Sequence, residues 1–264
     1  MLMAPILNES NVPSNRLPYN SRQRLPSTDS DDSSSEDNAA MDGPADEYKF
    51  TENSHSCTVL TGLNELRKAG QFCDVTLSVD GVKFPAHRNV LSSFSPYFKA
   101  MFLSKLAESK QSVVALKGIE VDMMSLLLDY AYTSSLVITR GNVQCLLSAA
   151  NLLQVLPVIE AACLFLERHM DATNCLGIHC FAEAHACTDL QKKAKCFALQ
   201  NFWEVCHQEE FLTVTAAKLV ELTSSDELEV EKEEAVFQAV ARWYNHKPEA
   251  RKLEFCKVLE TVRL

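Results

Sequence analysis

Thiol and imidazole side chains that could bind a metal ion are concentrated between residues 175 and 187, at Cys175, His179, Cys180, His185 and Cys187. Cysteine sulfur and histidine nitrogen are the usual zinc ligands. On a helix, however, Cys175 and His179 share one face, whereas Cys180 lies about 100° away from His179 and on the face of Cys187. Four ligands would converge on one ion only if the helix were broken. The pattern therefore favours packed thiols and partly exposed imidazoles, and we expect no metal and no cofactor.

Asp74 and Arg88 are a second group that could do chemistry. Asp74 stands at the start of a predicted strand and Arg88 just beyond its hairpin partner, so that the carboxylate and the guanidinium can meet as a charge pair. Catalysis would also need a nucleophile or an acid beside a substrate cleft, and the sequence indicates neither. We therefore expect this pair to lie inside the fold or in an interface.

Sequence signatures of enzymes are absent. The glycines never come closer together than eight residues, so neither a P-loop nor a dinucleotide-binding fingerprint can form. The patterns G-x-S-x-G and H-E-x-x-H are also missing. The sequence therefore favours a protein that is not an enzyme.

Charge and cysteine usage limit the remaining classes. Residues 1–55 carry 4 Lys/Arg against 10 Asp/Glu, and the rest of the chain carries 21 against 25. No basic run or stripe is present, so we expect no nucleic-acid partner. The ten cysteines form no C-x-x-C pair, which favours reduced thiols in the cytoplasm, with the nucleus and the cytoskeleton as alternatives. No apolar run reaches about 18 residues, so we expect no membrane partner.

Residues 1–55 have the composition of a disordered tail. They are rich in Ser, Asn, Asp and Pro, poor in aromatic residues, and contain an acidic serine cluster between Asp29 and Asp37. Such a segment buries too little apolar surface to offset the entropy lost on ordering. The serines among these carboxylates are also candidates for phosphorylation, which would add negative charge.

The stretch from Phe72 to Phe102 predicts two strands followed by helices. Apolar residues alternate from Val75 to Val79 and again after Asp80-Gly81, which favours a tight hairpin turn. A two-stranded ribbon is marginal in water, so it needs a helical cover. The apolar residues that follow have helical spacing, and Ser95-Pro96 can cap and restart a helix.

The remaining segments predict one mixed domain and one helical domain. Before Met170 the patterns indicate a helix from Val59 to Leu66, a short strand at 113–116, a helix at 121–132 buried on all sides, and helices started by Asn142 and Pro157. From Thr173 onward they indicate only helices, with caps at Thr188 and Thr215, acidic first-turn residues at 231, 233 and 234, and a last helix that continues to Leu264. Because the pattern stops without a polar cap, we expect a fragment of a longer protein.

Short motifs along the chain closely resemble two domains of kelch-like proteins. Four motifs resemble the BTB (POZ) domain: C-D-V at 73–75, A-H-R at 86–88, S-P-Y-F-K-A-M-F at 95–102 and D-Y-A-Y-T-S at 129–134. Three motifs resemble the BACK domain: N-C-L-G-I at 174–178, F-A-E-A-H-A-C at 181–187 and S-S-D-E-L at 224–228. The resemblance implies an α+β BTB/POZ domain at 56–170, followed by an all-α BACK domain at 171–264 that is truncated at its C-terminal end.

The resemblance also implies two protein partners. One is a second copy of the chain, bound through a leading helix with Val59, Leu60, Leu63 and Leu66 and through the first-strand region with Asp74 and Arg88. The other is the amino-terminal domain of cullin-3. Its contact residues would be Leu106 and Glu108 of a hydrophobic-x-Glu motif, with Phe102 and Tyr132 at neighbouring surface positions. The first two BACK helices, at about 174–205, would add a groove for the extended amino terminus of the cullin.

A protein with these partners would be a substrate adaptor of a cullin-RING ubiquitin ligase. Two features depart from the family pattern: Lys105 places a positive charge beside Leu106, and no Gly-Gly doublet of a kelch propeller is present. A protein substrate would then be bound by a C-terminal domain that is missing from this chain. The alternative is a dimeric scaffold without ligase activity, either a cytoskeletal kelch-type protein or a transcriptional co-regulator.

Overall fold

A computed structural model describes residues 49–104 and 111–262 of the chain. Its first half consists of α1 (His55–Lys68), β1 (Val75–Val79), β2 (Val82–Ala86), α2 (Arg88–Phe94), α3 (Pro96–Leu103), β3 (Val113–Leu116), α4 (Val121–Thr133), α5 (Val143–Leu152) and α6 (Leu156–Arg168). Its second half consists of α7 (Cys175–Ala184), α8 (Thr188–Gln200), α9 (Phe202–Val205), the 3-10 helix η2 (Glu210–Thr213), α10 (Ala216–Thr223), α11 (Glu233–His246) and α12 (Pro248–Leu259). The predicted order of an α+β unit followed by helices is confirmed.

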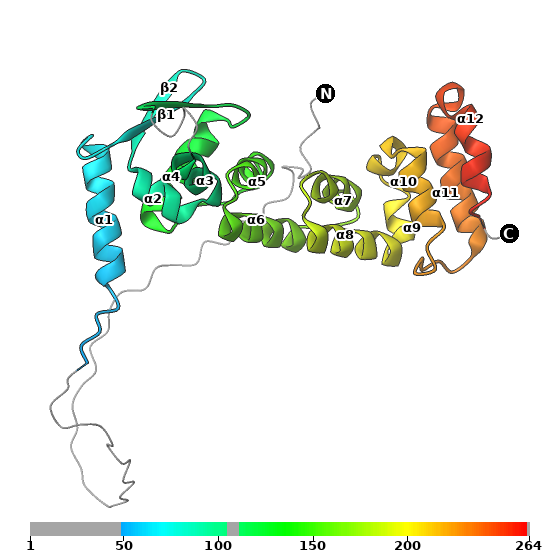
Figure 1. Cartoon of the computed structure of the whole chain (residues 1–264). Coiled ribbons are helices and arrows are strands. Elements are labelled where there is room, and N and C mark those ends of the chain that lie inside the picture. The colour runs from blue at the N-terminus through cyan, green and yellow to red at the C-terminus, as the bar shows by residue number, and fades with distance from the viewer. Residues whose placement is uncertain (1–48, 105–110, 263–264) are drawn as a thin grey trace, which may run out of the picture.

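The three strands form one small sheet in the order β2-β1-β3, at one end of the row of helices (Figure 1). β1 pairs with β2 in antiparallel orientation, with Val79 opposite Val82, and with β3 in parallel orientation. The turn predicted at Asp80-Gly81 is confirmed, since both residues have positive φ, 46° and 84°. Such angles suit the twist of a tight hairpin, and glycine adopts them without strain.

The sheet is covered by α2, α3 and α4, whose apolar side chains form the first core with Val75, Leu77 and Val79. The predicted restart at Ser95 is confirmed: its Oγ accepts the backbone N–H of Phe98 at 3.2 Å. The expectation that the helix after residue 121 is buried on all sides is wrong. Asp122 and Asp129 of α4 are exposed, and Asp129 pairs with Arg67 of α1 at 2.6 Å.

Of the predicted helix caps, Asn142 is confirmed in its position at the start of α5 but not in its hydrogen bonding, and Thr188 is wrong. The Asn142 side chain accepts the backbone N–H of Thr139 at 2.8 Å, one turn before α5, and makes no cap hydrogen bond to the helix. Thr188 is the first residue of α8, and Cys187 occupies the cap position. Both residue types bind nearby backbone groups in turns as readily as at caps. The cap at Thr215 is confirmed by its hydrogen bond from the Lys218 backbone N–H.

The helices after Met170 enclose a second core, centred on Trp243, whose indole N–H donates to the Val214 carbonyl at 2.9 Å. A third apolar cluster lies between the two halves and draws residues from α5, α6, α7 and α8. Figure 1 accordingly shows α6 and α8 following one another in a row below α5 and α7, and the two helices are in contact. Within the described ranges, no helix combines the length and apolar character needed to span a bilayer.

Candidate protein-interaction surfaces

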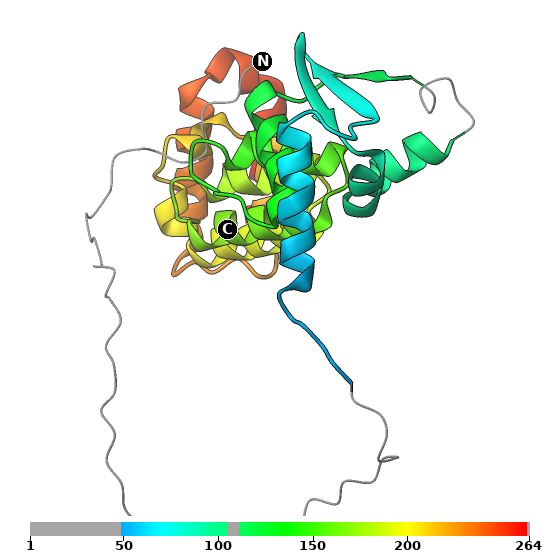
Figure 2. The ribbon, with the colours of Figure 1, turned by 90° about the vertical axis from the view of Figure 1, so that its left-hand side faces the viewer.

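The leading helix α1 offers an apolar surface at the edge of the molecule. None of its residues is buried, and it lies on the outside of the first half in two perpendicular views (Figures 1 and 2). Val59 is 46% exposed, whereas Leu60, Leu63 and Leu66 are half-buried. Leu60 and Leu63 also line a shallow hollow of about 310 Å³ against α2 and α4. These four residues were predicted to form a dimer interface. They all lie on α1, and the rest of the chain covers this helix only in part.

Asp74 and Arg88 meet, but the carboxylate is bound differently from the prediction. Asp74 Oδ1 accepts the backbone N–H of Arg88 at 2.8 Å, and the Arg88 side chain donates Nε–H to the Asp74 carbonyl at 3.3 Å. The guanidinium also donates to the Gln111 carbonyl and lies 4.6 Å from the centroid of the Phe102 ring. The two residues therefore connect the starts of β1 and α2 to the end of α3.

The four residues predicted to contact cullin do not all occupy the expected positions. Phe102 of α3 is half-buried and stacks on Phe98, with ring centroids 5.8 Å apart. Leu106 and Glu108 lie outside the described residues. The expected surface position of Tyr132 is wrong, because only 1% of this residue is exposed.

Tyr132 is buried because its hydroxyl finds partners inside the first core. The oxygen lies 3.0 Å from the backbone nitrogen of His87, which donates to it, and 2.9 Å from His87 Nδ1. Burial raises the pKa of the Tyr132 hydroxyl, so it stays protonated. Arg67 lies over the outer side of the ring at 4.9 Å. Tyr132 thus supports the α1 and α4 region from beneath and offers a partner no direct contact.

The thiols and imidazoles between residues 175 and 187 are used in packing. The prediction of partly exposed imidazoles is wrong for His179, which is 2% exposed and lies with Nδ1 3.0 Å from the Gln191 carbonyl and Nε2 2.7 Å from Lys218 Nζ. Cys175 is fully buried, and burial raises its pKa to about 12, so it is a neutral thiol. No three metal-binding side chains converge among residues 49–104 and 111–262.

The range 174–205, predicted to contain two helices that extend the cullin surface, contains three: α7, α8 and the short α9. The turn after α7 is held to α5, because the Asn151 side chain donates to the His185 carbonyl at 3.1 Å and the Ser148 hydroxyl lies 3.1 Å from His185 Nε2. Burial lowers the pKa of the His185 imidazole, which keeps it neutral in this contact. The amino-terminal BACK-like helices are therefore fixed against the first half of the chain.

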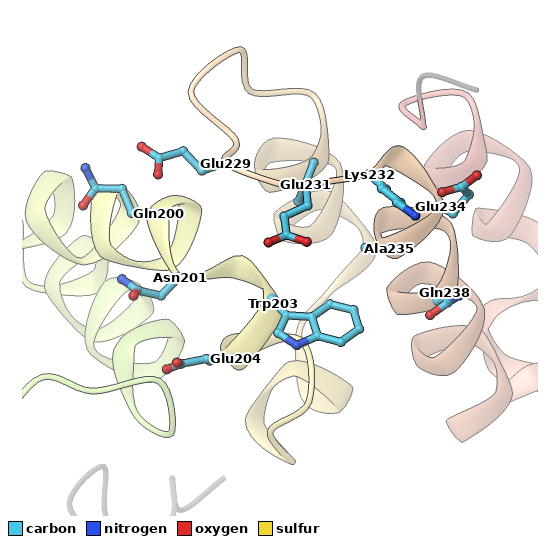
Figure 3. A pocket seen from close by; sticks show the side chains of 11 residues that line it. Gln200, Asn201, Trp203, Glu204, Glu229, Glu231, Lys232, Glu234, Ala235 and Gln238 are labelled. Atoms are coloured by element: carbon cyan, nitrogen blue, oxygen red, sulfur yellow. The ribbon is translucent and has the colours of Figure 1, made fainter.

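A groove that the sequence did not reveal lies at the far end of α8, between α9 and α11 (Figure 3). Its volume is about 700 Å³, and Trp203, Glu204 and Glu231 line it. One signal could have pointed to it: Phe202 and Val205 have core spacing on a short helix, which leaves Trp203 and Glu204 on the outer side. We name it the α9–α11 groove.

Comparison with known proteins finds two domain families in succession. The BTB/POZ domain family matches residues 63–170, and the family described as BTB And C-terminal Kelch (BACK) matches residues 175–264. Among solved structures, the BTB domain of zebrafish PATZ1 is 33% identical; the match covers 46% of this chain and 99% of that chain, with a TM-score of 0.43. The order of the two family matches is the order that the sequence motifs predict.

Proposed function

Because the chain belongs to the BTB–BACK proteins, whose two domains are non-catalytic interaction modules, we propose that it is a dimeric adaptor that joins cullin-3 to a protein substrate in a ubiquitin ligase. The observation that carries the proposal is the BTB domain followed directly by a BACK domain, an architecture typical of cullin-3 adaptors. The fixed contact between α5 and the α7–α8 turn supports it, since a cullin could then contact both domains at once.

In this proposal the two partners use different parts of the BTB domain. The second copy binds α1 through Val59, Leu60, Leu63 and Leu66, with Asp74 and Arg88 nearby in the first-strand region. The amino-terminal domain of cullin-3 binds the segment after α3, where Leu106 is the apolar anchor and Glu108 sets the register, and Phe102 is a further contact. The substrate is bound by a further domain, and the complex acts in the cytoplasm.

Calorimetric titration of the intact chain with the amino-terminal domain of cullin-3 tests the adaptor role. We expect binding, and we expect Leu106→Arg combined with Glu108→Lys to weaken it by about tenfold or more, as for the loss of an interface hot spot. The matched control is Leu253→Ser on α12, which replaces a residue that is 94% exposed and distant from the BTB domain. Its affinity should equal that of the parent protein. Absence of binding by the intact chain would contradict the adaptor role.

A dimeric scaffold without ligase activity is the second candidate. The observation that favours it is Lys105, whose positive charge stands directly beside the proposed anchor Leu106. Sedimentation of the same protein measures whether it is a dimer or a monomer. A dimer that does not bind cullin-3 supports the scaffold, whereas a monomer contradicts both. Val59→Glu with Leu60→Glu should convert the dimer to a monomer, because it places charge on the apolar surface of α1.

A further inference from the structure

Trp203 is a large aromatic residue at the surface of the BACK domain. The buried residues of α9 are Phe202 and Val205, three positions apart, so Trp203 lies on the outer side with 55% of its surface exposed. His207 packs against the indole from one side, with ring centroids 4.5 Å apart. Figure 3 shows the indole extending from α9 toward Ala235 and Gln238 of α11. Exposed tryptophan at the rim of a hollow is characteristic of protein-binding surfaces.

The α9–α11 groove is strongly acidic. Four carboxylates line it: Glu204 on α9, Glu229 and Glu231 on the segment between α10 and α11, and Glu234 in the first turn of α11. Lys232 is the only cationic side chain among the described residues that line the groove, so its lining carries a net charge of −3. No Lys, Arg or His of the described residues forms an ion pair with any of these four carboxylates. By contrast, Glu221 binds both Lys195 and Lys218.

The shape and composition of the groove suit an extended peptide. Its volume of about 700 Å³ lies within the range of ligand-binding clefts, about 300–1,000 Å³. Gln200, Asn201 and Gln238 add primary amides, which can both donate to and accept from a peptide backbone. The segment between α10 and α11 is anchored to α8, since the backbone N–H of Glu229 donates to the Leu199 carbonyl at 3.2 Å. Because the carboxylates are spread over several elements and do not converge as a metal site would, they fit several separate positive charges.

We propose that the α9–α11 groove binds an arginine-containing basic segment of a partner protein. A guanidinium group can stack on the Trp203 indole and at the same time form paired hydrogen bonds with a carboxylate such as Glu204 or Glu231. Arginine suits this site better than lysine, because only its planar group does both. The proposal does not rest on binding of cullin-3. Although α9 belongs to the range expected to extend the cullin surface, the groove lies at the end of α8 that is remote from the BTB domain (Figure 1).

Fluorescence anisotropy of a labelled peptide, Gly-Ser-Arg-Gly-Arg-Ser-Arg-Gly, titrated with the intact chain tests this proposal. We expect saturable binding that weakens about threefold to tenfold in Trp203→Ala, the range of a cation–π contact. Glu204→Gln with Glu231→Gln should weaken it at least as much. The control, Glu160→Gln with Glu249→Gln, removes the same charge from exposed positions on α6 and α12 and should bind like the parent. The peptide with lysine in place of arginine should bind less tightly.

Two outcomes would overturn the proposal. Equal weakening by the groove pair and the control pair would mean that the peptide responds only to the overall negative charge. Displacement of the peptide by the amino-terminal domain of cullin-3 would assign the groove to the cullin. Loss of cullin-3 binding alone, with peptide binding intact, would contradict the adaptor role and leave this proposal supported. If Trp203→Ala changes the circular dichroism spectrum, the paired glutamine variant decides, because both of its residues are exposed.

Discussion

Lys218 places a positive charge in an almost closed space between α7 and α10. Its Nζ lies 2.7 Å from His179 Nε2, and it donates to Glu183 at 3.1 Å and to Glu221 at 2.8 Å. Only 9% of the residue is exposed. A cation in such a place is tolerated because three acceptors replace its water. Burial would by itself raise the pKa of the Glu221 carboxyl, but hydrogen bonds from Lys218 and Lys195 outweigh burial and hold it at about 2.

Replacing Lys218 by methionine should therefore change how the free energy of unfolding depends on pH. A carboxyl whose pKa is lowered on folding stabilises the native state above its unfolded pKa of 4.5, and this stabilisation is lost as the pH falls toward about 2. Because Glu221 is more than a third exposed, screening limits its contribution to about 1 kcal/mol. Urea unfolding of Lys218→Met at pH 7 and at pH 3 should show a smaller difference than the parent protein. Lys192→Met, at an exposed position of α8, is the control. An unchanged difference in Lys218→Met would contradict the role of this contact.

At the scale of single elements, α3 depends on the side chain that starts it. The Ser95 hydroxyl accepts the Phe98 backbone N–H and donates to the Leu153 carbonyl at 2.6 Å, and the residue is fully buried. Ser95→Ala should lower the free energy of unfolding by about 2 kcal/mol, because it removes a helix cap and leaves a buried carbonyl without its partner. Chemical denaturation measures this loss. Ser93→Ala removes an exposed hydroxyl two residues earlier and should cost less than about 0.5 kcal/mol. Equal losses in the two variants would show that the two hydrogen bonds of the Ser95 hydroxyl add nothing to the free energy of unfolding.

Elements fixed by short-range chemistry could be predicted from the sequence. The hairpin at Asp80-Gly81 and the restart at Ser95 each depend on residues within three positions of one another. Contacts with distant segments could not. Periodicity places Tyr132 on a helix face, but the partner that buries its hydroxyl is His87, 45 residues earlier. Sequence periodicity also predicted the strand at 113–116, but it did not indicate that this strand pairs with β1 in parallel orientation.

The candidate surfaces were predictable to different degrees for the same reason. The apolar residues of α1 follow from helical spacing alone, whereas the α9–α11 groove needs two helices and the segment before α11 to come together. Trp203 lies in an amphipathic stretch in which an aromatic residue is more often part of a core. Its exposure depends on how α9 packs, which no local pattern specifies. The cullin contact of Leu106 and Glu108, in contrast, stays a prediction that rests on resemblance to a family motif and not on spacing.

At the scale of the whole molecule, the third cluster joins the BTB and BACK domains. Val143, Leu147, Ala162 and Leu166 on the BTB side are fully buried with apolar residues of α7 and α8. The boundary predicted near residue 170 thus falls between two helices, α6 and α7, which both have buried side chains in the same apolar cluster. Apolar burial at this density stabilises both sides together. We therefore expect the two domains to unfold as one cooperative unit.

Leu147→Ala tests this coupling, because Leu147 belongs to α5 of the BTB domain and Trp243 reports on the separate core of the BACK domain. Trp243 is 1% exposed, and in a Trp203→Phe background its fluorescence is the only tryptophan signal. Removing a fully buried leucine side chain should cost about 2–4 kcal/mol. If the domains are coupled, the urea midpoint reported by Trp243 falls accordingly. Leu253→Ala, at an exposed position of α12, should leave this midpoint unchanged. An unchanged Trp243 midpoint in Leu147→Ala, together with an earlier loss of helical circular dichroism, would mean that the domains unfold independently.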